Sequence, residues 1–376
     1  MCHRHVLDAV SRTLCDITQD DRPFGGIVTL LAGDFRQILP VVRLGRRRRT
    51  EIVDAALSRS PLWQQITVVK LQRNMRVENC ARDDDHASLL LQHADWLLQL
   101  GDGKLPLTDD GDVKLSPELC VSSVDELTTF VFADLTTHSS GVVWVSSRAI
   151  LCPRNDTVDA MNNRIMDIFP GDTVTCLSVD TVGEVDQQAL YPVEYLNSLN
   201  LSGLQPHRLN IKVGVPIMLL RKFGTWTRCE VTAMERDTSC GRSVVGISKQ
   251  RSRAASTPAM RVVHPADTTV AYGRRHAVLP FTLRRRQFPV RPAFAVTINK
   301  TQGQTLTKCG VLLDEPVFTH GQLYVAALRC GSPQNIRFFV NNFQTVNVVY
   351  KEVLYVNKYS VACNTTRGRL FCFNVF

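Results

Sequence analysis

The chain has 376 residues, of which 44% are hydrophobic and 21% are charged, a composition typical of a folded protein with more than one core. The net charge of +9 favours an anionic partner such as a nucleic acid or a nucleotide. There is no run of 18 apolar residues, and the first residues lack the apolar stretch of a secretory signal. We therefore expect neither a membrane span nor secretion.

The twelve cysteines are scattered, and no CxxC pair occurs. This usage predicts reduced thiols in an intracellular compartment. Cys2, His3 and His5 could suggest a metal site, but no second pair of ligands follows at a suitable spacing. A solvated helix start is the favoured interpretation, and we predict no metal site from these residues.

The first elements alternate between helix and strand. Residues 3–17 carry apolar side chains at helical spacing, whereas 27–32 form a short β-branched run bounded by glycines. Such a run is typical of a buried parallel strand, and it leads into a loop with the sequence GDFRQ. A second run, 66–71, repeats the pattern and leads into QRNMR.

The pattern of predicted secondary structure changes twice in the later part of the chain. A helix is predicted near 86–100, and a polar stretch at 101–114 indicates a domain junction. Residues 141–171 predict a strand, a loop and an amphipathic helix, which is the start of another α/β unit. Short β-like runs at about 207–290 indicate a small all-β insertion. We then expect a return to α/β texture at 293–313, a helix near 319–330 and a strand at 336–340.

Three polar side chains lie where an NTP-driven motor needs sensors of the γ-phosphate. Gln37 and Arg76 each follow a predicted strand, and Arg329 lies near the end of the helix GQLYVAALR. Two arginines and a glutamine can grip a phosphate from several sides. Taken singly, each arginine is more typical of a surface residue, and GDxxQ is more typical of a turn, so the order of the segments carries the interpretation.

Five segments in order resemble helicases of the Pif1 family, and most closely the branch carried by Helitron transposable elements: GDFRQILPVV, LQRNMR, LNIKVGVPIMLLR, FPVRPAFAVTINKTQGQTL and HGQLYVAALR. The resemblance covers residues 1 to about 340. It implies an α/β fold with RecA-like domains, the second interrupted by a small SH3-like β insertion. The implied boundaries are 1–77 for the C-terminal part of the first RecA-like domain, 78–140 for a linker, 141–340 for the second with its insertion at about 207–290, and 341–376 for a tail.

The resemblance also implies roles for individual residues. Gln37 would sense the γ-phosphate, Arg76 would match the arginine of the fourth helicase motif, and Arg329 would be the arginine finger. Further nucleotide contacts are implied for Gly33, Asp34, Gly303 and Tyr324. Contacts with DNA are implied for Thr297, Asn299, Lys300, Gln302 and His320; hydroxyl and amide groups such as those of Thr297 and Gln302 suit the phosphate backbone.

Three positions depart from the family's pattern. Leu328 stands where the family has serine or threonine, and Pro292 stands where it has leucine, at the entry of a predicted strand where proline is tolerated. After LLRKFG the family continues with a glycine-rich turn, which residues 225–228 replace here. The geometry of that loop is therefore open.

Two parts of an ATP site have no counterpart in the sequence. No GxxxxGK[ST] phosphate loop occurs, and Gly103-Lys104 is followed by leucine in a polar stretch. The acidic pair that would hold Mg²⁺ is absent too. The resemblance places the acidic pair just before Met1 and the phosphate loop upstream of that pair, so we expect an incomplete first RecA-like domain that folds poorly alone. A truncated gene model, a transposon relic and a retained DNA-binding module are the competing explanations, with the first two favoured.

Basic runs offer a candidate path for DNA. Arg43 and residues 46–49 follow the GDFRQ loop, while Arg274, Arg275 and residues 284–286 flank the end of the β insertion. They could follow the phosphates of a single strand, or form a solvated surface or a nuclear-import signal. The four tryptophans are more typical of core residues, and Trp226, in a basic loop, is the exception.

The predicted function is an ATP-dependent DNA helicase of 5′-to-3′ polarity, using ATP and Mg²⁺ and acting on single-stranded and duplex DNA in the nucleus, with the mitochondrion as the alternative. Repair, recombination, telomere maintenance and transposition are the implied pathways. The isolated chain is expected to lack ATPase activity. The rival hypothesis is a DNA-binding fragment or relic without a motor.

Overall fold

The structure is a computed structural model, and it describes residues 2–42, 48–71, 74–75, 77, 83–133, 135, 142–183, 190–199, 204–220, 228–237, 242–249, 259–263, 265–270, 281–354 and 370–374. These residues fall into two compact units. The first comprises residues 1–122, 301–305 and 311–376, and the second comprises 123–300 and 306–310. The domain boundaries implied by the resemblance stay a prediction.

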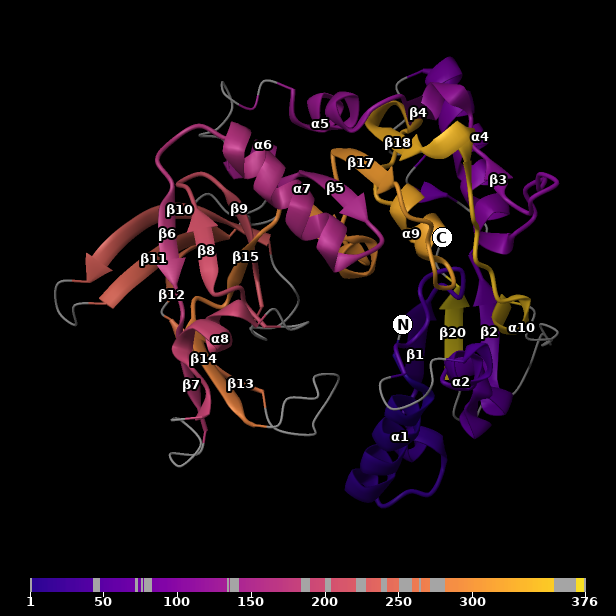
Figure 1. The fold of residues 1–376 in the computed structure, drawn as a ribbon. Coiled ribbons are helices and arrows are strands. Elements are labelled where there is room, and N and C mark those ends of the chain that lie inside the picture. The colour runs from indigo at the N-terminus through magenta and orange to yellow at the C-terminus, as the bar shows by residue number, and fades with distance from the viewer. Residues whose placement is uncertain are drawn as a thin grey trace. The chain divides into compact units, whose positions relative to one another are not determined.

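The first unit is α/β (Figure 1). Its helices are α1 (Arg4–Thr18), α2 (Arg49–Asp54), α4 (Asp84–Asp102), α9 (Gln322–Ala327) and α10 (Lys351–Leu354). Its strands are β1 (Thr29–Gly33), β2 (Ile66–Lys70), β3 (Val113–Lys114), β4 (Cys120–Val121), β18 (Ile336–Val340), β19 (Gln344–Thr345) and β20 (Leu370–Asn374), together with the last residues of β17 (Lys308–Leu313). The sheet β1-β20-β2 is parallel throughout, and β17, β18 and β4 are neighbours in that order in a second, five-stranded sheet.

The second unit combines an α/β part with a β-rich part. Its helices are α5 (Val124–Phe132), α6 (Val142–Ser146), α7 (Asn155–Ile168) and α8 (Val193–Ser198). Its parallel pair is β16 (Ala295–Thr297) with β5 (Arg148–Cys152), beside the first residues of β17. The β-rich part contains β6 (Val174–Leu177), β7 (Val179–Val182), β8 (Arg208–Ile211), β9 (Pro216–Leu219), β10 (Arg228–Asp237), β11 (Arg242–Lys249), β12 (Ala259–Val263), β13 (Ala266–Val270), β14 (Leu283–Gln287) and β15 (Val290–Pro292).

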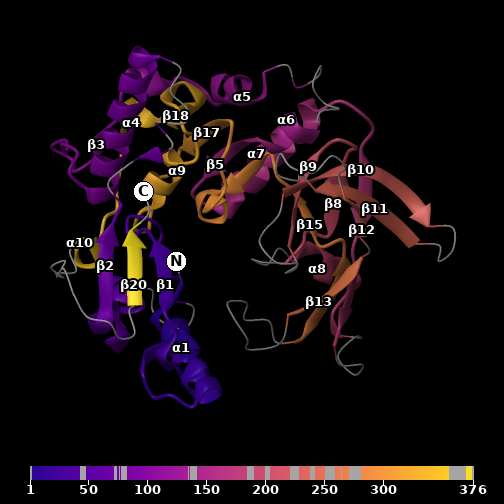
Figure 2. The same cartoon turned by 180° about the vertical axis from the view of Figure 1, so that it is seen from behind.

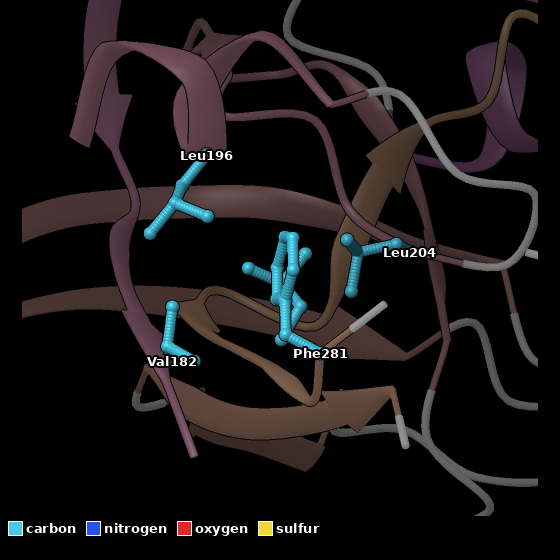
Figure 3. Packing of buried hydrophobic residues seen from close by; sticks show 5 residues of the cluster. Val182, Leu196, Leu204 and Phe281 are labelled. Carbon is cyan, nitrogen blue, oxygen red and sulfur yellow. The ribbon is translucent and has the colours of Figure 1, made fainter. Parts of the chain in front are cut away.

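The β-rich part forms antiparallel sheets with the orders β12-β11-β10-β9-β15, β13-β14-β7 and β6-β8. The region predicted to be all-β, near 207–290, does contain strands, and β6 and β7 add two further strands on its N-terminal side. Helix α8 closes one end of a small core made by Val182, Leu196, Leu204, Phe281 and Leu283 (Figure 3). Because these side chains come from separate segments, the core holds the β-rich part together.

Local signals explain where the two long helices of the first unit begin and end. The His3 ring caps α1 by accepting a hydrogen bond from the His5 N–H at 3.2 Å. Asp83 caps α4 through the His86 N–H at 2.7 Å, and acidic residues occupy the first turn, as the helix dipole favours. Gly103 ends α4 in the left-handed conformation that glycine adopts without strain.

The predicted strand at the start of 141–171 is wrong in position. Residues 142–146 are helix α6, and the strand is β5, which begins at Arg148. The run Val-Val-Trp-Val favours a strand on propensity, but tertiary packing decides: Val145 is 1% exposed, and the Arg148 guanidinium lies 4.2 Å from the centre of the Trp144 ring. The predicted helix near 319–330 is likewise shorter, at Gln322–Ala327.

Candidate functional site

The loop after β1 carries the predicted residues Gly33, Asp34 and Gln37. Asp34 is 4% exposed, and its carboxylate accepts hydrogen bonds from the Arg36 N–H at 3.0 Å and from the Tyr324 hydroxyl at 2.9 Å. Burial raises the pKa of Asp34, while these bonds and the Gln37 side chain favour its charged form and oppose the rise. Asp34 thus ties the loop to helix α9.

Arg36 fixes the same loop to helix α4. Its Nε donates to Asp102 Oδ1 at 2.6 Å, and both side chains are less than one fifth exposed. Burial alone would raise the pKa of Asp102, but the hydrogen bond and charge of Arg36, with help from Lys104, lower it. Because Asp102 ends a helix, where negative charge is unfavourable, the guanidinium also offsets the helix dipole there.

Gln37 meets the loop formed by residues 301–305. The Gln302 Nε2 donates to the Gln37 Oε1 at 2.9 Å, and both side chains are half-buried. Gly303, the next residue, is exposed and has a φ of +84°. The structure therefore joins a residue expected to sense nucleotide with one expected to contact DNA, and both belong to the first unit.

Arg329 holds the same 301–305 loop. The residue is 4% exposed, and Nη1 donates to the carbonyl oxygens of Thr301 at 2.8 Å and Gln304 at 2.7 Å. Its Nε donates to the Val325 carbonyl at 2.8 Å, within α9. In this structure the predicted arginine finger is a clamp on the backbone of the loop.

His320 lies wholly buried behind the GDFRQ loop. Its Nδ1 accepts from the Tyr350 N–H at 2.8 Å, so Nε2 carries the proton and donates to the Phe35 carbonyl at 2.8 Å. Burial lowers the pKa of His320. Since both ring nitrogens are engaged inside the protein, the side chain supports the loop and does not face solvent.

Gly321, which was not predicted as a site residue, makes this packing feasible. It has a φ of +70°, and a Cβ there would lie 2.1 Å from the Arg36 carbonyl oxygen. At Gly101 a Cβ would lie 2.6 Å from the Arg36 side chain and 2.9 Å from the Tyr324 ring. Gly321 lies inside the helix predicted near 319–330, and the observed helix begins after it, at Gln322. No local pattern marks Gly101.

Three predicted DNA contacts belong to the second unit. Thr297 ends strand β16 and is 7% exposed, and Asn299 and Lys300 follow in a short 3-10 turn. Burial and the charge of Arg291 lower the pKa of Lys300. Asn162 of α7 holds β16 in place by exchanging two hydrogen bonds with the Ala295 backbone, at 2.9 and 3.0 Å.

The basic run 284–286 does not act as one surface. Arg285 is 0% exposed, and two of its nitrogens bind the Asp180 carboxylate at 2.8 and 2.5 Å. The remaining bonds go to the carbonyls of Leu196, Leu199 and Gln205, at 2.9 to 3.1 Å. A phosphate-contacting role for Arg285 is therefore wrong, because strand alternation turns it inward, while Arg284 is exposed.

Several predictions lie outside the described residues: Arg76, Trp226, Arg43, Arg46, Arg47, Arg274 and Arg275. Within the described ranges, no group of three His, Cys, Asp or Glu side chains could hold a metal ion. Across the same ranges, every helix is too short or too polar to cross a membrane.

Two family models match the chain. The model described as "PIF1-like helicase" matches residues 1–111, and the model of the Pif1 DNA helicase 2B domain matches residues 194–224. The "ATP-dependent DNA helicase PIF1" of Homo sapiens is 24% identical over 365 residues, which cover 89% of this chain and 46% of the human protein. The chain thus spans less than half the length of that relative.

Solved helicase structures share the fold. The crystal structure of Pif1 helicase from Candida albicans matches with a TM-score of 0.58 and 23% identity, over 94% of this chain and 73% of that one. The Bacteroides Pif1 helicase crystallised with ADP-AlF3 and single-stranded DNA matches with a TM-score of 0.55 and 18% identity, over 96% and 71%. The expected α/β fold of RecA-like type is confirmed.

Proposed function

We propose that the chain forms the sensing and DNA-coupling part of an ATP-dependent DNA helicase of the Pif1-like family. Pif1 family models match residues 1–111 and 194–224, and the fold is that of solved Pif1 helicases. The relatives that match it are named for ATP-dependent helicase activity, and one neighbour holds a nucleotide analogue and single-stranded DNA. The finer assignments are 5′-to-3′ polarity, Mg²⁺ use, a place in repair, recombination, telomere maintenance or Helitron transposition, and a nuclear or mitochondrial location.

The hydrogen bond between Gln37 and Gln302 carries this proposal. Loss of the γ-phosphate from a bound nucleotide would move the Gln37 side chain, and that movement would reach the 301–305 loop through the hydrogen bond to Gln302. Arg329 would transmit a second signal, because it holds the Thr301 and Gln304 carbonyls of the same loop. Coupling needs such contacts between the two kinds of site.

The proposed roles divide by burial. We assign ligand contact to Gln37, Gln302 and the exposed Gly303, and we keep Asn299, Lys300 and the buried Thr297 of the second unit as proposed DNA contacts. Asp34, His320, Tyr324 and Arg329 act by positioning, since each is at most 4% exposed and bonded within the protein. Gly33 supplies backbone at the strand end, and Arg76 keeps its proposed sensor role.

The described residues do not fit a complete ATP–Mg²⁺ site. Arg329 is committed to backbone carbonyls, and Asp34 is buried against Tyr324. No cluster of metal-ligating side chains occurs among the described residues, and the sequence holds no phosphate loop. We therefore propose that the chain alone has no ATPase activity.

The second candidate is a DNA-binding fragment or relic without a motor. The burial of Arg329 favours it, because a finger held by three backbone carbonyls does not reach a γ-phosphate without breaking them. The two candidates share DNA binding and differ in nucleotide chemistry.

An assay of the purified chain separates the two candidates. Binding to a labelled oligothymidine should weaken steeply as salt rises, and Gln302→Ala should weaken it about threefold to tenfold, the value of one net hydrogen bond. Exposed Gln64→Ala is the matched control and should bind as the parent does. DNA-stimulated ATPase or strand separation would exclude the fragment; loss of salt-sensitive binding altogether would exclude both candidates.

A further inference from the structure

Strand β20 occupies an unusual position in the sheet of the first unit. It comes from the last residues of the chain, yet it lies between β1 and β2, with the order β1-β20-β2 (Figures 1 and 2). Both pairings are parallel and five residues long. Strands β1 and β2 pair with β20 and not with each other.

We propose that β1 and β2 form a slot one strand wide, and that the segment Leu370–Asn374 fills it as a built-in completing strand. Neighbouring strands lie about 4.8 Å apart, so β1 and β2 are held at roughly twice that distance, too far for direct pairing. Without the segment, the facing backbone groups of both strands would lose their partners. Such open edges pair readily with other extended chains.

The sequence of the segment suits a middle strand. Leu-Phe-Cys-Phe is an unbroken apolar run without glycine or proline, as in parallel strands buried on both faces. The neighbouring strands read TLLAG and ITVVK, which are similar in character. Fifteen residues separate α10 from β20 along the chain, and at about 3.4 Å per residue they can span roughly 50 Å. The segment can therefore reach the slot from its own unit.

The core below the sheet explains why the spacing matters. Leu31 of β1 and Val68 of β2 both pack against the cluster of Leu7, Phe24, Trp63 and Ile66. Both are also in register with the same residue of the completing strand, Cys372. The segment thus sets the distance at which two strands share one core.

The slot also supports the candidate site, because β1 runs directly into Asp34 at its C-terminal end. Withdrawal of the segment would loosen β1 and, through it, the loop that carries Gln37. The proposal does not depend on the helicase assignment, since it rests on strand pairing alone.

The test removes the segment and returns it as a peptide. Hydrogen exchange is followed at Thr29–Gly33 and Ile66–Lys70 in the full chain and in a chain that ends at Gly368. We expect exchange in both strands to accelerate at least roughly tenfold without the segment, while Arg148–Cys152 of the second unit is unchanged. A synthetic peptide of residues 366–376 should restore protection.

Proline supplies the matched control, because it lacks the N–H that a middle strand must donate. A peptide with Cys372→Pro should not restore protection, whereas one with Cys372→Ala should. The full chain with Cys372→Pro should behave as the shortened chain does. The proposal is overturned if shortening leaves exchange in β1 and β2 unchanged, if the proline peptide restores protection equally, or if no peptide restores it.

Discussion

Two buried arginines, one in each unit, have different structural roles. Arg285 binds the Asp180 carboxylate and joins β14 to β7 and to the segment around α8. Arg329 binds the carbonyls of Thr301 and Gln304 and joins α9 to the 301–305 loop. The first holds a core together, and the second holds a loop that carries candidate ligand contacts. Burial of a charged residue therefore does not by itself separate structural from functional roles; what it is bonded to does.

The largest expected effect is the loss of the buried pair in the second unit. Arg285→Ala leaves Asp180 as an uncompensated buried charge, so we expect the free energy of unfolding to fall by about 3–5 kcal/mol. Denaturant unfolding measures it. The exposed neighbour Arg284→Ala should change it by less than about 0.5 kcal/mol. Equal effects from the two substitutions would show that Arg285 has no special structural role.

Gly321→Ala should disturb the first unit nearly as much. The new Cβ would lie 2.1 Å from the Arg36 carbonyl oxygen, and the alanine would have to adopt a φ of +70°. Together the clash and the strained backbone should lower the free energy of unfolding by about 2–4 kcal/mol. Thermal unfolding gives the change. Gly33→Ala is the control, because a Cβ there meets no atom within 4 Å. If Gly321→Ala is as mild as its control, the loop and α9 do not pack as described.

Arg329→Ala removes three hydrogen bonds from a charged donor to buried carbonyls. We expect a loss of about 2–3 kcal/mol in the first unit, with faster hydrogen exchange in residues 301–305. Half-buried Arg337, which also donates to backbone carbonyls, provides the comparison, and Arg337→Ala should cost about 1 kcal/mol or less. An unchanged 301–305 loop in the Arg329 variant would argue for a free arginine finger.

Acid should weaken the first unit through His93 of α4. Burial lowers the pKa of His93 from 6.5 to about 4. Between these two pH values the side chain is protonated in the unfolded chain and neutral in the folded chain. Stability present above pH 6.5 is then lost as the pH falls towards 4, by about 2 kcal/mol at pH 5. His93→Phe should remove this part of the pH dependence. A variant with the same pH profile as the parent would show that His93 does not titrate in this way.

The elements that the sequence predicted well are those with a local signal. Strand 336–340 matches β18, because it is a short apolar run. The helix predicted at 86–100 lies within α4, because apolar spacing and the N-cap Asp83 mark it. The strand predicted at 27–32 overlaps β1, but the prediction that it is buried is wrong, because Leu30 is 60% exposed. The strand predicted at the start of 141–171 was wrong, because the β-branched run at 142–146 forms helix α6, which packs against strands distant in sequence.

Non-local features escaped prediction for a physical reason. Three adjacent arginines look alike in sequence, and only strand alternation and a carboxylate 105 positions away separate Arg285 from its neighbours. Strand β20 pairs with β1 and β2, which lie about 340 and about 300 positions earlier, and no local pattern encodes such pairing. The candidate site residues followed from resemblance, while their supports, Asp102, Gly101 and Gly321, required the structure.

The link between Gln37 and Gln302 is the smallest expected effect and the most direct test of the account. Single-stranded DNA affinity should be measured for the parent, Gln37→Ala, Gln302→Ala and the double variant. If the contact couples the two loops, the double variant should lose less than the sum of the single losses, with an interaction energy of about 1 kcal/mol. Additive losses, within about 0.3 kcal/mol, would contradict coupling through this contact.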